Sequence, residues 1–184
     1  MKELNLFPDK NFWDGKNVFI SGHSGFKGGW LSLWLKELGA NVTGYSLEPN
    51  TKPSFYNACD IGSVTNSIFG NILDYKKLES SINKFKPEII IHMAAQALVL
   101  ESYKNPLNTY ETNIIGTLNI LEIIRNKSYV KVFINVTSDK CYENIEKKYS
   151  YKESDRMGGH DPYSSSKGCS ELVTSAYRLS FFNK

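Results

Sequence analysis

Residues 16–39 read KNVFISGHSGFKGGWLSLWLKELG, and this stretch decides the fold. KNVFIS predicts a short buried strand, a glycine-rich turn follows it, and an apolar helical pattern then ends at Gly39, as at a helix C-cap. The turn consists of Gly22, His23, Ser24, Gly25, Phe26, Lys27 and Gly28.

A glycine-rich turn between a first strand and a first helix is typical of a pyrophosphate site. Because glycines lack a Cβ, the backbone can approach the phosphates, and the helix N-terminus supplies free N–H groups and partial positive charge. The spacing here is G-x-x-G-x-x-G, not the commoner G-x-G-x-x-G. A purely structural role, in which three glycines tighten the β–α turn, is the alternative. The position after the first strand favours phosphate binding.

Strand and helix patterns alternate along the rest of the chain. EIIIH (residues 88–92) is β-branched and nearly unbroken, as in a parallel strand covered on both faces, and VKVFINV (residues 130–136) is a second buried run. The alternation predicts an α/β fold with a doubly wound parallel sheet of Rossmann type, flanked by helices. Further strands are expected at 41–45 and 67–71, and helices at 75–85, 107–125 and from Pro162 toward Phe182.

The composition predicts one well-packed cytoplasmic domain. Hydrophobic residues make up 41% of the 184 residues, and a net charge of +3 with scattered lysines does not indicate nucleic acid. Three separated cysteines have no metal-ligand spacing and favour a reducing cytoplasm. The first residues carry acids and a proline where a signal peptide needs an apolar core. No apolar stretch approaches the roughly 18 residues of a membrane span.

Near the end of the chain, YSSSK places Tyr163 and Lys167 one helical turn apart on the same face of a helix. A nearby cation favours the ionised form of a phenol, so such a tyrosine can accept a proton near neutral pH. The spacing alone is also common on solvated helix faces. Its meaning therefore depends on the segments upstream.

Five segments together resemble the extended short-chain dehydrogenase/reductase superfamily, and within it the CDP-glucose 4,6-dehydratases, which act on nucleotide-sugars. The resemblance runs from about Phe12 to the last residue. The segments are GHSGFKGGWLSLWL (22–35), HMAAQALV (92–99), TYETNIIGTLNILE (109–122), INVTSDKCYEN (134–144) and MGGHDPYSSSKGCSELV (157–173).

The resemblance implies NAD-dependent dehydration of CDP-glucose. Tyr163 would take the proton of the sugar 4-hydroxyl while NAD accepts hydride from C4, and Lys167 would hold the nicotinamide ribose. Ser138 would hydrogen-bond the 4-oxygen, Asp139 would protonate the departing 6-hydroxyl, and Lys140 would be the base at C5. A lysine base must be neutral, which burial beside other positive charge favours. Thr137 to Lys140 could instead be only a polar strand end.

Further residues are implied to contact NAD. No arginine follows the second strand to hold a 2′-phosphate, and the nearest acid is Glu48, so NAD is preferred over NADP. Two departures weaken the match: Asn71 stands where the family usually has Asp, and Leu100 where it often has Arg. The implied cofactor residues are Gly22, Ser24, Gly25, Phe26, Lys27, Gly28, Ser46, Asn71, Ile72, Ala94, Ala95, Gln96, Asn113, Tyr163 and Lys167.

Members of the resembled family run to about twice this length, consistent with two domains. We therefore expect residues 1–184 to be the NAD-binding domain, with the C-terminal substrate domain absent and little or no catalysis by the isolated chain. The relatives dimerise through two long helices, so a homodimer through a four-helix bundle is expected at 107–125 and 164–182. Another nucleotide-sugar dehydratase or epimerase, and a non-catalytic dinucleotide-binding protein, remain alternatives.

Overall fold

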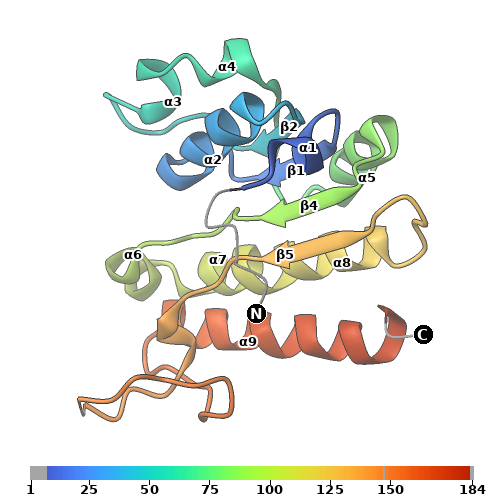
Figure 1. The fold of residues 1–184 in the computed structure, drawn as a ribbon. Helices are drawn as coiled ribbons and strands as arrows, with labels where there is room; N and C mark the ends of the chain where they lie inside the picture. The colour runs from blue at the N-terminus through green and yellow to red at the C-terminus, as the bar shows by residue number, and fades with distance from the viewer. Residues whose placement is uncertain (1–7, 147, 183–184) are drawn as a thin grey trace.

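A computed structural model describes residues 8–146 and 148–182 as one sheet with helices on both faces (Figure 1). The strands are β1 (Asn17–Ser21), β2 (Asn41–Ser46), β3 (Asn66–Phe69), β4 (Ile89–His92) and β5 (Val132–Asn135). The helices are α1 (Lys10–Trp13), α2 (Phe26–Glu37), α3 (Phe55–Ala58), α4 (Ile61–Val64), α5 (Tyr75–Phe85), α6 (Val99–Lys104), α7 (Pro106–Tyr110), the π-helix η1 (Glu111–Ile115), α8 (Gly116–Ile124), the 3₁₀ turn η2 (Asp139–Cys141), α9 (Pro162–Tyr177) and the π-helix η3 (Arg178–Phe182).

All five strands are parallel and lie in the order β3-β2-β1-β4-β5. The chain therefore winds outward in both directions from β1, which confirms the doubly wound sheet. The carboxyl ends of β1, β4 and β5 lie at one edge, where the glycine turn, the AAQ segment and η2 follow them. Three of the predicted site segments thus share one edge of the sheet.

Two apolar cores lie on opposite faces of the sheet. Phe19 and Ile90 face the first core, which α5, α8 and α9 complete. Val18, Ile20 and Ile91 face the second core, which α2 covers. In Figure 1, α9 runs alongside α7 and α8 on the side away from α2.

The predicted burial of the fifth strand is wrong on one face. Val132 and Ile134 pair with Ile89 and Ile91 of β4 and point to the same side of the sheet. Their exposed fractions are 41% and 44%, whereas Ile89 and Ile91 are buried. The residues that the structure describes place no helix over β5 on that side. An apolar run thus predicted the strand but not its missing cover.

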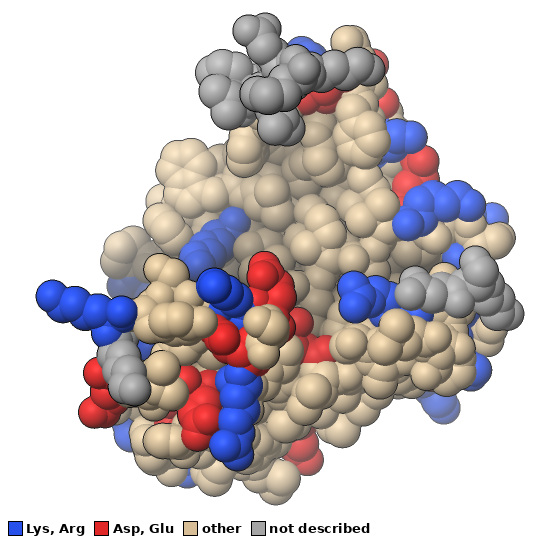
Figure 2. Space-filling view, turned by 60° about the horizontal axis from the view of Figure 1, so that its bottom comes forward, with Lys and Arg blue, Asp and Glu red and all other residues tan. Residues whose placement is uncertain are grey.

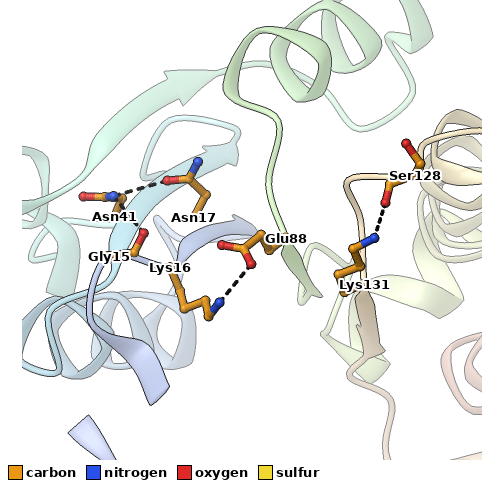
Figure 3. A network of polar contacts seen from close by, with 7 residues as sticks. All are labelled: Gly15, Lys16, Asn17, Asn41, Glu88, Ser128 and Lys131. Atoms are coloured by element: carbon orange, nitrogen blue, oxygen red, sulfur yellow. Dashed lines mark hydrogen bonds and ion pairs between the residues drawn. The ribbon is translucent and has the colours of Figure 1, made fainter. Parts of the chain in front are cut away.

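The amino-terminal edge of the sheet is held by polar contacts (Figure 3). Lys16, just before β1, donates to Glu88, just before β4, across 2.9 Å. The Asn41 side chain donates to the Gly15 carbonyl and to the Asn17 amide oxygen, each at 3.2 Å. These contacts join β1 to β2 and β4 at the edge opposite the predicted site.

The long helix expected at 107–125 is present as a continuous run with an internal change of pitch. α7 leads into the π-helix η1 and then into α8. A single π-helical turn inside an α-helix often marks a functional site. Here it contains Asn113, one of the predicted site residues. Among the described residues, no helix has the length and apolar character needed to cross a membrane.

Candidate active site

Close packing accounts for two of the three glycines in the turn. Gly22 has φ +84°, and a Cβ there would lie 2.7 Å from the Ala94 backbone nitrogen. A Cβ at Gly28 would lie 2.2 Å from the Gly22 carbonyl oxygen. The structural alternative therefore explains Gly22 and Gly28 well, because no side chain fits at either position.

Gly25 is different, because a Cβ there would meet only the Gly22 oxygen, at 3.4 Å. Gly25 is the N-cap of α2 and has no side chain with which to satisfy the first N–H groups of the helix. Those groups and the positive end of the helix dipole are suited to an anion. The turn therefore fits the pyrophosphate of NAD.

The side chains of the turn reach in different directions. The Ser24 hydroxyl donates to the Leu47 carbonyl at 2.8 Å, which ties the turn to the end of β2. Phe26 is exposed and meets Phe55 edge-on, with 5.3 Å between ring centroids. Lys27 is exposed beside them. The first two contacts tie the turn to the end of β2 and to α3.

His23, within the turn, was given no role in the sequence analysis, yet its side chain is fully buried. Its Nδ1 lies 3.0 Å from the Ser46 hydroxyl and its Nε2 3.0 Å from the Ser67 hydroxyl. Burial lowers the pKa of His23 to about 4, so the ring is neutral. The sequence signal for it is Gly44, where a Cβ would lie 2.1 Å from the His23 ring. The Ser46 hydroxyl, expected to face the cofactor, is engaged with this ring.

Asn71 and Ile72, the pair expected near the adenine, follow β3. The Asn71 side-chain oxygen accepts from the Leu73 N–H at 2.9 Å, and the Asn71 backbone carbonyl accepts from the Tyr45 hydroxyl at 3.0 Å. Ile72 is buried against α8, where a Cβ at Gly116 would lie 2.7 Å from the Ile72 side chain. The structure thus gives both residues a role in the fold, and contact with adenine stays a prediction.

Asn113 joins the AAQ segment to α9. Its Oδ1 accepts from the Gln96 N–H at 2.9 Å, and its Nδ2 donates to the Gln96 carbonyl at 3.1 Å and to the Ser166 hydroxyl at 2.8 Å. Ala94 and Ala95, just before Gln96, are half-buried at the same edge. The Asn113 amide thus holds the AAQ segment against α9, and its contact with NAD stays a prediction.

A buried hydrogen-bond network that sequence reasoning missed runs beside Asn113. The Ser21 hydroxyl, at the end of β1, lies 2.6 Å from His92 Nδ1, and His92 Nε2 lies 3.1 Å from the Thr117 hydroxyl. Thr117 is also 3.0 Å from the Ser170 hydroxyl of α9. Burial, with the nearby Lys167 charge, lowers the pKa of His92 to about 3, so this histidine is neutral.

The directions of these bonds follow from neutral His92. Ser21 accepts from the Met93 and Ala94 N–H groups, so its proton goes to His92 Nδ1. His92 then carries its proton on Nε2 and donates it to Thr117, which donates in turn to the Asn113 carbonyl at 2.7 Å. Every member is satisfied, and the network links the glycine turn to α9.

Ser138, Asp139 and Lys140 form a tight turn at the end of β5. The Ser138 hydroxyl accepts from the Lys140 N–H at 3.2 Å and donates to Asp139 Oδ1 at 3.1 Å. The side chains of Asp139 and Lys140 are exposed, whereas Cys141 is buried. The burial expected around Lys140 is therefore absent from the part of the chain that the structure describes.

A strong cap fixes the start of α9 and hence the position of Tyr163. The Asp161 carboxylate accepts from the Ser164 N–H at 2.9 Å and the Ser164 hydroxyl at 2.6 Å, and Pro162 is the first helical residue. Partial burial acts to raise the pKa of Asp161, but the hydrogen bonds from Ser164 prevail and lower it.

Lys167 lies one turn after Tyr163 and is 7% exposed, while Tyr163 is half-buried. The Lys167 Nζ donates to the Val136 carbonyl at 3.4 Å. Burial lowers the pKa of Lys167 to about 8, and the charge of Glu171 opposes this shift. The lysine thus stays largely protonated near neutral pH, as its predicted role requires.

In the view of Figure 2, positive and negative side chains are interspersed, and the hollowed middle of the molecule is largely uncharged. This distribution agrees with the small net charge of +3 and gives no basic surface for nucleic acid in that view.

A parallel doubly wound sheet, a glycine turn opening its first helix and a Tyr-x-x-x-Lys pair at the carboxyl edge together define a Rossmann-type protein of the short-chain dehydrogenase/reductase class. A family model narrows the class to one family, since the GDP-mannose 4,6-dehydratase model matches residues 19–182. The chain belongs to that family.

Individual relatives agree with this assignment. CDP-glucose 4,6-dehydratase of Salmonella typhimurium is 54% identical over 175 residues, which are 95% of this chain and 49% of that protein. UDP-glucose 4-epimerase of Thermotoga maritima, solved with UDP-glucose, superposes with a TM-score of 0.79 at 26% identity over 90% of this chain and 52% of that one. The Thermus thermophilus UDP-glucose 4-epimerase complex with NAD gives 0.77 at 25% identity, over 90% and 51%. The chain spans about half the length of the relatives it matches.

Proposed function

We propose that the chain is the cofactor-binding part of a CDP-glucose 4,6-dehydratase, which converts CDP-glucose to CDP-4-keto-6-deoxyglucose. The observation that carries this proposal is the 54% identity to the Salmonella typhimurium enzyme across 95% of the chain. The site geometry supports it, because the glycine turn, the Ser138 turn and the Tyr163–Lys167 pair lie at one edge of the sheet.

Oxidation at C4 is the first step of the proposed reaction. Bound NAD would supply the acceptor for the C4 hydride and return it to C6 at the end. Tyr163 takes the proton of the 4-hydroxyl, so the C4–O bond becomes a carbonyl. Lys167, buried one turn away, would hold the nicotinamide ribose. Ser138 hydrogen-bonds the 4-oxygen.

Loss of water is the second step, because the 4-keto group acidifies the C5 hydrogen. Lys140 takes the C5 proton, the C5–C6 double bond forms, and Asp139 gives a proton to the 6-hydroxyl, which leaves as water. After hydride has added at C6, Lys140 returns a proton to C5. Lys140 is exposed in this chain. The desolvation that makes a lysine a base must therefore come from the bound sugar or from a region that the relatives have outside the part matched by this sequence.

The test uses the 184-residue chain with NAD and CDP-glucose. A dehydratase product has lost one water, whereas an epimerase product keeps the mass of the substrate, so mass spectrometry separates the two. We expect calorimetry to show NAD binding with little CDP binding and at most a few turnovers, because the chain lacks half of its relatives' length. An isomer of unchanged mass would contradict the proposal. Sustained turnover would contradict only the expected weakness.

The C5 base has its own test in a full-length form of the protein. Lys140→Ala is expected to abolish solvent hydrogen exchange at C5, while oxidation at C4 by Tyr163 continues. Exchange that survives in this variant would exclude Lys140 as the base.

We also propose a cytoplasmic homodimer. Support comes from apolar side chains on the outer faces of η1 and α9, where Ile115 is 45% and Leu172 60% exposed, and from cysteines that are all free in the described chain. Leu172→Glu is expected to halve the mass in analytical ultracentrifugation. A monomeric parent protein would contradict the dimer.

A further inference from the structure

Two side chains of α9 form hydrogen bonds with two successive residues just after β5. Lys167 donates to the carbonyl of Val136, and Glu171 accepts from the hydroxyl of Thr137. Lys167 and Glu171 are four residues apart, so they lie on the same face of the helix. A cation and a carboxylate of α9 therefore bind two successive residues of the segment that follows β5.

Val136 and Thr137 lead directly into the turn of Ser138, Asp139 and Lys140. Gly168 lies between Lys167 and Glu171 and lets the turn pack against α9, because a Cβ there would lie 3.2 Å from the Cys141 carbonyl oxygen. Burial raises the pKa of the Cys141 thiol, and the Glu171 charge raises it further.

Glu171 also supplies the charge that opposes desolvation of Lys167. Of the titratable groups near Lys167, Tyr163 and Glu171 lie one turn away on α9, and His92 of β4 is close enough for the Lys167 charge to lower its pKa. His92 is neutral because burial holds its pKa near 3. Burial lowers the pKa of Lys167 to about 8 and Glu171 raises it. Glu171 is thus the carboxylate whose charge opposes the effect of burial on the pKa of Lys167.

We propose that Glu171 is a positioning residue: through Thr137 it sets the place of the Ser138–Lys140 turn relative to Tyr163, and from one turn further along α9 it places a negative charge on the same helix face as Lys167. The consequence for catalysis rests on the proposed function, since these are the elimination and oxidation halves of that reaction. The contacts themselves require neither NAD nor sugar, so the proposal is testable without turnover.

The charge is tested by the titration of Lys167 in the whole chain, followed by the ¹³Cε resonance of isotopically labelled lysine. Lys167→Met identifies the resonance. In the parent chain the midpoint is expected near 8. Glu171→Gln, which keeps an oxygen for Thr137, is expected to lower the midpoint by on the order of one unit. Glu37→Gln removes an exposed carboxylate at the end of α2. This variant is the matched control and should leave the Lys167 midpoint unchanged.

The hydrogen bond is tested separately with Thr137→Val, which retains the Glu171 charge. Amide exchange at Cys141, whose N–H is bonded to the Ser138 carbonyl at 3.0 Å, is expected to quicken about tenfold in Thr137→Val and to stay near the parent rate in Glu171→Gln. An unchanged Lys167 midpoint in Glu171→Gln, or unchanged exchange in Thr137→Val, would overturn the corresponding half of the proposal. Either result would leave the proposed dehydratase activity untouched.

Discussion

The glycine turn shows how one motif divides between packing and binding at the level of single residues. Gly22 and Gly28 leave no space for a Cβ, since their nearest backbone neighbours would lie 2.7 and 2.2 Å away. Gly25 has space, with one contact at 3.4 Å. The structural and the phosphate interpretations of the motif therefore apply to different glycines.

This division predicts opposite outcomes for two alanine variants. Gly25→Ala is expected to fold with nearly the parent melting temperature but to weaken NAD binding at least tenfold, because the new methyl group lies over the first N–H groups of α2. Gly28→Ala is expected to destabilise the fold by several kcal/mol, through a backbone clash with Gly22. Thermal unfolding and NAD calorimetry measure both. A Gly25→Ala protein that binds NAD as the parent does would remove the turn from the cofactor site.

Single residues also mark the limit of what the sequence predicts. The YxxxK pair, the Ser138 turn and Asn113 could be predicted because their motifs carry the residue types that the chemistry needs. His23 and Glu171 could not, since their importance comes from neighbours distant in sequence: Ser46 and Ser67 for His23, and Thr137 for Glu171. The exposure of Lys140 was also beyond prediction, because burial depends on what the rest of the fold covers.

At the level of elements, α8 and α9 are joined through buried hydroxyl groups rather than through apolar packing alone. Thr117 bonds to His92 of β4, to the Asn113 carbonyl and to Ser170 of α9. Ser170 in turn lies 2.9 Å from the Asn135 amide of β5. These contacts hold the YxxxK helix in register with the strand ends, so they fix the distance between the glycine turn and Tyr163.

Thr117→Val keeps the shape of the side chain and removes its hydroxyl. The variant leaves the His92 Nε2–H and the Ser170 hydroxyl without their buried partner, so the free energy of unfolding is expected to fall by about 1–3 kcal/mol. Thr51→Val, at an exposed threonine, is the control and should change it by less than about 0.5 kcal/mol. Urea unfolding of the two variants measures the difference. Equal stabilities would show that the network adds nothing to the fold.

The elements themselves were predicted unevenly, for physical reasons. β4 and α5 match the expected ranges closely because β-branched runs and a regular apolar period determine them. The π-helical turn at 111–115 was not predicted, since a local change to wider pitch leaves the apolar period almost unaltered. The four-residue helices α3 and α4 were missed because so short a segment shows no period at all.

At the scale of the whole molecule, two buried neutral histidines make stability depend on pH. Their pKa values in the folded chain are about 4 for His23 and about 3 for His92, below the ordinary value of about 6.5. Unfolding lets both rings take up a proton below that value. Their contribution is therefore fully present above about pH 6.5 and is lost as the pH falls toward the folded values.

As the pH falls from 6.5 to 5, each histidine should lower the free energy of unfolding with a slope that steepens toward about 1.4 kcal/mol per pH unit. Urea unfolding at closely spaced pH values measures the slope, and this range lies above the titration of most carboxylates. His160→Gln, which changes an exposed ring, should leave the slope as it is. A flat stability profile from pH 7 to 5 would mean that the two rings are accessible to protons in the folded chain.

The uncovered face of β5 gives the molecule two unlike sides. Ile91 and Ile134 are paired neighbours that point to the same face, one 6% and the other 44% exposed. Ile91→Ala is expected to cost about 2–5 kcal/mol of stability, as in a packed core, and Ile134→Ala less than about 1.5 kcal/mol. Urea unfolding at several protein concentrations compares them.

Equal costs for the two variants would show that something covers β5 in solution, and a cost that grows with concentration would identify the cover as a second copy. The same pair reports on any longer form of the protein. If additional chain packs on this face, the cost of Ile134→Ala should rise toward that of Ile91→Ala, while the cost of Ile91→Ala stays the same, because Ile91 is already buried.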